Sequence, residues 1–124
     1  MRPGLRGQVS AVVGDADTAA ALGSGDVPVL GTPRLLALAE AAAVVALAGR
    51  LGDGRTSVGT RVELDHRAPS PVGARVTVEA ELEEVDGNRL VFGFQAVDER
   101  GSAVGGGHVE RVVVDRERFA ARLQ

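Results

Sequence analysis

The feature that most constrains this chain is an apolar segment at residues 32–49, with the sequence TPRLLALAEAAAVVALAG. Alanine and leucine are strong helix formers. Thr32 suits the N-cap of a helix, Pro33 its first helical position and Gly49 the position after its end. The segment is therefore predicted to form one long helix.

Between Leu35 and Ala48 the only polar side chain is that of Glu40, so this helix is apolar on all sides. A helix of this kind must be surrounded by other parts of the protein. The apolar run is shorter than a membrane span, and the segment carries Arg34 as well as Glu40, which favours a buried helix in a protein with no membrane partner.

The residues from Thr56 onward alternate in polarity as strands do and are separated by turn residues. One face of the first strand is predicted to carry Val58, Thr60, Val62, Leu64 and His66. The predicted strands are 56–66, 75–83, 90–97 and 103–114, with a hairpin turn at 86–88, a glycine interruption at 105–107 and a short closing helix at 115–123.

Earlier in the chain, residues 8–13 are predicted to form an edge strand, 16–22 a short helix and 23–28 a loop. A strand, a long helix and four mostly antiparallel strands predict an α+β fold, with one antiparallel sheet wrapped around the long central apolar helix. A length of 124 residues with 44% apolar content fits a single domain spanning 1–124. Because one sheet covers only part of such a helix, we also expect a homodimer.

The composition excludes several classes of function. With 17 acidic and 14 basic residues, a net charge of -3 and no aromatic residue other than three phenylalanines, a nucleic-acid partner is not expected. The absence of cysteine removes thiol nucleophiles and cysteine-ligated zinc, and two histidines leave little for another metal site, so no metal or cofactor is predicted. The N-terminal sequence MRPGLRGQVS lacks the apolar run of a signal peptide, which predicts a cytoplasmic protein.

Glu40 is the first candidate for chemistry, because a carboxylate within an apolar helix is costly to bury unless it is paired or protonated. Burial would raise its pKa towards the range that general acid or base catalysis requires. The alternative is that Glu40 faces solvent or forms a structural ion pair with an arginine.

His66 is the second candidate, since its place in the alternation with Val62 and Leu64 turns it towards the helix. Glu40 and His66 would then share one apolar region, although a lone histidine is more often a hydrogen-bonded structural residue. His108, which follows three glycines, shows no such convergence, and we interpret it as structural.

Thr32 either caps the helix or uses its hydroxyl, together with the free N–H groups of the helix start, to polarise a carbonyl oxygen. Eight residues separate Thr32 from Glu40, which corresponds to about 12 Å along a helix and about 80° around it. A direct hydrogen bond between them is not expected. His66, a water, the substrate or a second subunit would have to lie between them.

Two further clusters indicate structure rather than chemistry. The glycines at 105–107 lack the GKS or GKT ending of a phosphate loop and lie in a strand pattern, which favours a bulge or close backbone packing. The predicted strand at 75–83 also carries carboxylates on its solvent-exposed face, from Glu79, Glu81, Glu83 and the adjoining Glu84. We interpret them as solvated surface residues and not as a metal site.

As an ordered set, several motifs resemble those of the hot dog fold thioesterases, and most closely the fluoroacetyl-CoA thioesterase family. The motifs are Thr32, Glu40, SVGT at 57–60, His66, APSPVGARVTV at 68–78, DGNRL at 86–90 and GHVER at 107–111 leading to Phe119. The resemblance implies a hot dog fold homodimer with an acyl-CoA site at the subunit interface. It also implies that Thr32, Glu40 and His66 are catalytic, that Gly59 lines the acyl site and that Arg111 lies near it.

One departure concerns the acyl group. The fluoroacetyl enzyme has phenylalanines before its catalytic threonine that form a lid, whereas residues 23–30 here contain no aromatic side chain. The resemblance therefore implies a thioesterase for a short or medium acyl chain, carried by CoA or by an acyl carrier protein. The alternatives are a non-catalytic acyl-CoA or acyl-ligand binding protein of the same fold, and a hot dog dehydratase or hydratase, whose usual Asp or Glu and His motif is not found here.

Overall fold

The computed structural model describes all 124 residues, Met1–Gln124. The five strands form one antiparallel sheet in the order β1-β3-β4-β5-β2. The predicted order of a strand, a long helix and four further strands is confirmed. The elements are β1 (Arg6–Val12), the 3-10 turn η1 (Asp15–Asp17), α1 (Ala19–Leu22), α2 (Thr32–Ala46), β2 (Arg55–His66), β3 (Arg75–Asp86), β4 (Arg89–Asp98), β5 (Ala103–Asp115) and α3 (Arg116–Ala121).

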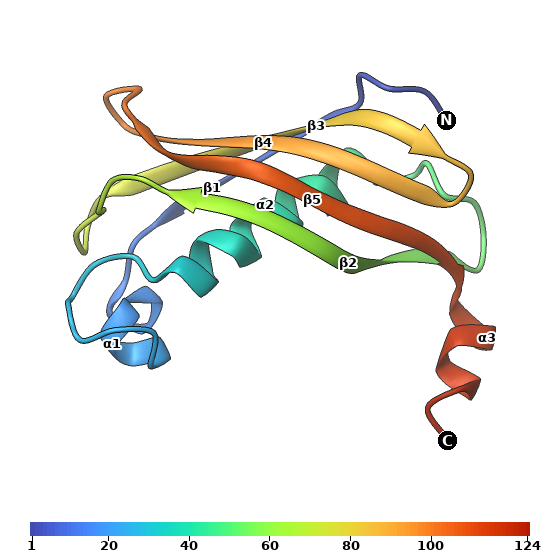
Figure 1. Ribbon diagram of the computed structural model, residues 1–124, viewed down its shortest axis with the longest axis horizontal. Helices are drawn as coiled ribbons and strands as arrows, with labels where there is room; N and C mark the ends of the chain where they lie inside the picture. Colours follow the sequence, from blue (N-terminus) through green and yellow to red (C-terminus); the bar gives the residue numbers. More distant parts are fainter.

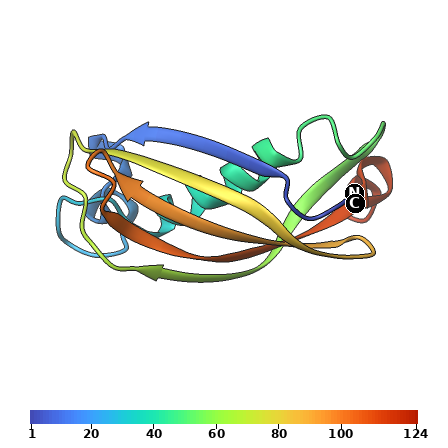
Figure 2. The ribbon, with the colours of Figure 1, turned by 90° about the horizontal axis from the view of Figure 1, so that it is seen from above.

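The sheet curves around α2, with α1 and its loops at one end of the molecule and α3 at the other (Figures 1 and 2). Helix α2 packs mainly against β1 and β3. Gly7 of β1 makes this close approach possible, because a Cβ atom there would collide with the α2 backbone at Ala42 and Ala46. The predicted α+β arrangement of one antiparallel sheet around a long central helix is confirmed.

The core lies between α2 and the sheet, and its largest fully buried side chains are Phe92, Leu35, Leu82, Leu90, Val76, Val78, Val104 and Val109. The opposite side of α2 is uncovered, with Val44 and Val45 exposed by 49% and 48%. The expectation that the helix is surrounded on all sides is therefore not met within one chain. None of the helices combines the length and apolar character that crossing a membrane requires.

The ends of the helices differ from the predicted ones. Gly31, with φ -74° and ψ 142°, is the N-cap of α2, so Thr32 is the first helical residue and does not cap the helix. The helix ends at Ala46, and Gly49 adopts a left-handed φ of 72° in the turn that follows. Helices α1 and α3 are also shorter than predicted, because 3-10 and turn geometry replace their outer residues.

A β-bulge at Thr60 changes which side chains of β2 face the helix. The register between β2 and β5 shifts at this residue, and Gly59 is paired with the buried Arg111. Because directly paired residues of antiparallel strands share a face, Gly59 faces α2 and its neighbour Val58 faces away. His66 is directed towards the helix as predicted, but the prediction that Val58 and Thr60 share its face is wrong.

Strand β5 runs continuously through the glycines at 105–107, so the predicted interruption is also wrong. Close backbone packing explains these glycines. A Cβ atom at Gly105 or Gly107 would collide with the carbonyl oxygen of Asp65 or Glu63 on β2. The two strands therefore lie too close together for side chains at these positions.

Candidate active site

Thr32 and His66 meet at the start of α2. His66 is the last residue of β2, and its ring turns towards the helix, where Nδ1 lies 2.8 Å from the Thr32 Oγ1 atom. A hydroxyl can donate its proton to a neutral imidazole nitrogen at this distance. The pair has the geometry of a hydroxyl next to a general base.

The environment of His66 favours its neutral form. Burial lowers the pKa of the imidazole from its usual value of 6.5, and an interaction with the Ala68 backbone acts in the opposite direction. The Nε2 atom is buried and has no hydrogen-bond partner of good geometry, and no carboxylate forms an ion pair with the ring. His66 is therefore suited to accept a proton near neutral pH.

Glu40 belongs to a second group of residues. Its Oε2 atom accepts a hydrogen bond from Arg111 Nη1 at 3.2 Å, and the Glu40 side chain is 37% exposed whereas that of Arg111 is 9% exposed. Gly59 leaves the space for this carboxylate, because a Cβ atom there would collide with Oε2. The carboxylate is thus paired and half-exposed, which matches the ion-pair alternative and not a carboxyl group buried alone.

Ser57 holds the other side of the Arg111 guanidinium. Arg111 Nε donates to the Ser57 Oγ atom at 2.8 Å, and Nη2 donates to the Ser57 carbonyl oxygen at 2.9 Å. Sequence reasoning did not identify Ser57 as a site residue. The spacing between Ser57 and Gly59 could have identified Ser57. It lies two positions before Gly59 and so shares the face of β2 that turns towards Glu40.

The two groups do not meet within one chain. No hydrogen bond or ion pair joins Glu40 to His66. The helix itself separates Glu40 from Thr32 by about 12 Å. The predicted region shared by Glu40 and His66 is therefore not a direct contact in the protomer.

The start of α2 offers one free backbone donor to a substrate. Pro33 has no N–H, and the N–H groups of Arg34 and Leu35 donate to the Gly31 carbonyl at 3.0 and 3.1 Å. The N–H of Thr32 has no such partner and lies at the positive end of the helix dipole. The several free donors expected from the sequence are reduced to this one.

A cavity of about 330 Å³ opens beside Thr32 and His66. The loop before α2 supplies much of its lining, with apolar side chains from Val27, Val29 and Leu30. Polar groups from Ser24, Asp26 and Arg67 also line it, and no aromatic side chain does. The cavity has room for a small acyl group next to the Thr32 hydroxyl.

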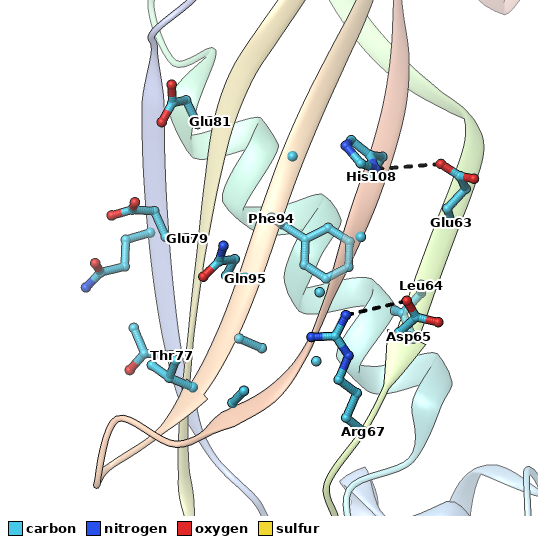
Figure 3. A pocket seen from close by; sticks show the side chains of 18 of the residues that line it. Glu63, Leu64, Asp65, Arg67, Thr77, Glu79, Glu81, Phe94, Gln95 and His108 are labelled. Atoms are coloured by element: carbon cyan, nitrogen blue, oxygen red, sulfur yellow. Dashed lines mark ion pairs between the residues drawn. The ribbon is translucent and has the colours of Figure 1, made fainter.

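A larger hollow, of about 1080 Å³, lies on the face of the sheet opposite α2. Figure 3 shows that acidic side chains gather here, with His108 near Glu63. The His108 Nδ1 atom is 3.6 Å from Glu63, and its Nε2 atom is 3.3 Å from Glu83. Because Thr32, Glu40 and His66 are not among the residues that line it, size alone does not identify the candidate site.

The model of the fluoroacetyl-CoA-specific thioesterase family matches residues 13–117 of this chain. The fluoroacetyl-CoA thioesterase of Streptantibioticus cattleyicolor is 39% identical over 99 residues, which cover 77% of this chain and 68% of that protein. A substituted form of the fluoroacetyl-CoA thioesterase FlK in complex with acetyl-CoA has a TM-score of 0.91 and 34% identity, with 99% of this chain and 96% of that chain covered.

A hypothetical protein of Thermus thermophilus, described as a thioesterase superfamily member, also has a TM-score of 0.91, with 30% identity and coverage of 99% of this chain and 93% of that chain. These similarities extend over nearly the whole chain and include the curved sheet and its central helix. They confirm the hot dog thioesterase fold that the sequence predicts. Together with the match to the family model, they establish that the chain belongs to the fluoroacetyl-CoA-specific thioesterase family.

Proposed function

We propose that this protein is an acyl-CoA thioesterase that hydrolyses a short or medium acyl thioester, with Thr32, Glu40 and His66 as its catalytic residues. The observation that carries the proposal is the 2.8 Å contact between the Thr32 hydroxyl and the imidazole of His66 at the start of α2. This contact brings a nucleophile, a base and a backbone donor to the mouth of a cavity of about 330 Å³.

The reaction begins when the Thr32 hydroxyl, or a water that it positions, attacks the thioester carbonyl carbon. His66 takes the proton of the attacking group, and the Thr32 N–H donates to the oxyanion that develops. The carbon–sulfur bond then breaks, and His66 gives the proton to the departing thiolate. Where Thr32 itself has attacked, the acyl group is then an ester of the Thr32 oxygen, and a water hydrolyses this ester. Glu40 takes one proton of that water, the bond to the Thr32 oxygen breaks, and the proton passes to that oxygen as the carboxylic acid leaves. A single oxyanion donor contributes about 3 to 4 kcal/mol in other acyl-transfer enzymes.

Glu40 joins this chemistry when two copies of the chain pair through β2. This strand is at an edge of the sheet, and its Val62 is 43% exposed. Val44 and Val45 on α2 are exposed to a similar extent. Antiparallel pairing of β2 with its copy reverses the strand direction. The end of one strand, with His66, then lies near the Gly59 and Glu40 region of the other copy, and a two-fold axis produces two such sites.

Within such a dimer, Glu40 is better suited to act as a base than to orient His66. The Nδ1 atom of His66 is occupied by Thr32, and the Nε2 atom is buried within its own chain. A carboxylate from a second copy therefore has no free ring nitrogen to contact. The half-exposed Glu40 carboxylate, held by Arg111, faces the region where an attacking water would lie.

The acyl group is proposed from the cavity beside His66. Its volume of about 330 Å³ and its lining by Val27, Val29 and Leu30 favour a short or medium chain. The absence of aromatic side chains at 23–30 argues against selectivity for the fluorinated acyl group. Comparison of CoA esters with acyl carrier protein thioesters identifies the carrier of the acyl group.

The test is a panel of acyl-CoA esters and acyl carrier protein thioesters, with release of free thiol measured over time. Glu40→Gln and His66→Ala are each expected to lower turnover about tenfold or more while the protein stays folded. His108→Ala removes a histidine on the opposite face of the sheet and is the matched control, with turnover close to that of the unmodified protein. Wild-type turnover in both site variants would exclude the mechanism, and binding of CoA esters without thiol release would favour a binding protein.

A further inference from the structure

We propose that Ser57 is a positioning residue, which fixes the Arg111 guanidinium and through it the Glu40 carboxylate. The inference rests on the proposed function, because it assigns Ser57 a role in the hydrolysis in which Glu40 takes part. Ser57 itself does not touch the reacting atoms.

The three hydrogen bonds of Arg111 carry this proposal. Two of them go to Ser57, from Nε to the hydroxyl oxygen at 2.8 Å and from Nη2 to the carbonyl oxygen at 2.9 Å. The third goes from Nη1 to the Glu40 carboxylate at 3.2 Å. Because the guanidinium is planar and its donors form a rigid fork, two bonds on one edge fix the direction of the third.

Glu40 depends on this support because little else holds its carboxylate. Its side chain is 37% exposed, and the neighbouring Gly59 contributes no side chain against which it could pack. Arg111, by contrast, is 9% exposed, so its orientation is set by its hydrogen-bond partners, two of which are atoms of Ser57. Ser57 therefore holds the Arg111 guanidinium in a fixed orientation, and the position of the Glu40 carboxylate follows from that of the guanidinium.

Removal of the Ser57 hydroxyl leaves the Nε donor of a buried guanidinium without its side-chain acceptor. A buried donor without a partner is unfavourable, so the guanidinium turns towards another acceptor and the Glu40 carboxylate turns with it. The acyl cavity lies beside Thr32 and His66 and is not lined by Ser57. The change is therefore expected to lower kcat and to leave KM nearly unchanged.

The variants that test this role are Ser57→Ala, Ser57→Thr and Thr56→Ala. Ser57→Ala is expected to lower kcat about three- to tenfold with KM within about twofold, and Ser57→Thr, which keeps the hydroxyl, is expected to restore kcat. Thr56 is the matched control, because it pairs with Val114 on the opposite face of β2. A double variant, Ser57→Ala with Arg111→Lys, is expected to have the kcat of Arg111→Lys alone.

A second readout does not depend on activity. The Nε–H signal of Arg111 in nitrogen-15 NMR spectra is expected to be protected from solvent exchange in the unmodified protein and in Ser57→Thr, and to lose that protection in Ser57→Ala. If the unmodified protein releases no thiol, the proposed function fails while this measurement still tests the contact between Ser57 and Arg111.

Unchanged protection in Ser57→Ala, or an unchanged kcat, would overturn the positioning role. A loss of kcat that Ser57→Thr does not restore, or a drop of similar size in Thr56→Ala, would overturn it as well. Should Ser57→Ala fail to fold, Ser57→Cys replaces it, since the thiol keeps the shape of serine and is a much weaker acceptor. The same losses of kcat and of Arg111 protection are then expected.

Discussion

Gly59 determines where the Glu40 carboxylate can lie. A Cβ atom at this position would collide with Glu40 Oε2, and Gly59 is not among the glycines with positive φ, so its backbone accepts an alanine. The obstacle is the end of a flexible side chain, and we expect Gly59→Ala to cost less than about 1 kcal/mol of unfolding free energy. The displaced carboxylate is expected to lower thiol release about tenfold, measured with the best ester of the panel.

Gly93→Ala is the matched control for this substitution. A Cβ atom at Gly93 would collide with the Glu83 carboxylate, so the obstacle is again the end of a glutamate side chain. This pair lies on the outer face of the sheet and lines the large acidic hollow instead of the candidate site. Equal effects of the two alanine variants on turnover would contradict the role given to Gly59.

The ionisation of His66 gives the pH dependence a definite direction. Burial lowers its pKa from 6.5, which means that the folded protein binds this proton less readily than the unfolded chain does. The contribution of His66 to stability is therefore complete above pH 6.5 and is lost as the pH falls through the lowered pKa.

Turnover is expected to follow the same direction, because only the neutral ring accepts a proton. The acid limb of kcat/KM should then have its midpoint below pH 6.5. Proton NMR titration of the imidazole measures the pKa directly, and the variant His108→Asn identifies the His66 signal. A midpoint above 6.5 in both experiments would contradict the effect of burial.

At the scale of elements, polarity patterns predicted the helix and strands but not the bulges between them. The pattern of β2 gives no sign that Thr60 is an extra residue, because threonine is tolerated on either face of a strand. In β3 the alternation likewise holds as far as Leu82, where the register with β4 shifts. One extra residue exchanges the two faces of a strand, which is why Gly59 and not Val58 lies beside Glu40.

The same limit applies to the candidate site. The proximity of His66 to the helix could be predicted, because it follows from the polarity of a single strand. The partner of Glu40 could not be chosen from 14 arginines, since Arg111 is 71 residues away in sequence and reaches Glu40 through the register of β2 with β5. Local patterns fix elements, whereas tertiary pairing fixes contacts.

The connection between η1 and α2 depends on Asp17. Its carboxylate accepts hydrogen bonds from Arg34 Nε at 2.9 Å and from the Gly14 N–H at 2.8 Å, and its carbonyl accepts one from the Gly31 N–H at 2.9 Å. Both side chains of the Asp17–Arg34 ion pair are partly exposed, so solvent weakens their attraction. Asp17→Ala is therefore expected to lower the free energy of unfolding by about 1 to 2 kcal/mol, measured by urea denaturation. Turnover should fall too, because Gly31 directly precedes Thr32.

An exposed ion pair provides the comparison for Asp17. Arg6 Nη2 lies 3.0 Å from Glu81, with the two side chains exposed by 62% and 42%. Arg6→Ala is expected to lower the free energy of unfolding by less than about 1 kcal/mol and to leave turnover unchanged. If Asp17→Ala were no more destabilising than Arg6→Ala, the helix start would not depend on the Asp17 carboxylate.

At the scale of the whole molecule, the residues proposed to be catalytic form two separate groups in the protomer. Thr32 and His66 lie at the start of α2, whereas Glu40 lies two turns further along the helix with Arg111. The uncovered side of α2 and the free edge of β2 are the surfaces that a second copy would cover. The proposed pairing of two copies would account at once for the exposed valines and for the separation of the residues proposed to be catalytic.

Mixed dimers distinguish a site shared between copies from a site within one chain. Thr32→Ala and Glu40→Gln are each expected to be nearly inactive alone. After the two variants are mixed and allowed to exchange subunits, half of the dimers contain one copy of each, and each mixed dimer then has one site with both residues intact. About a quarter of the wild-type turnover should return. Mixing Thr32→Ala with His66→Ala is the control, because these residues lie in the same group and no intact site can form. Recovery in the control, or none in the first mixture, would contradict the shared site.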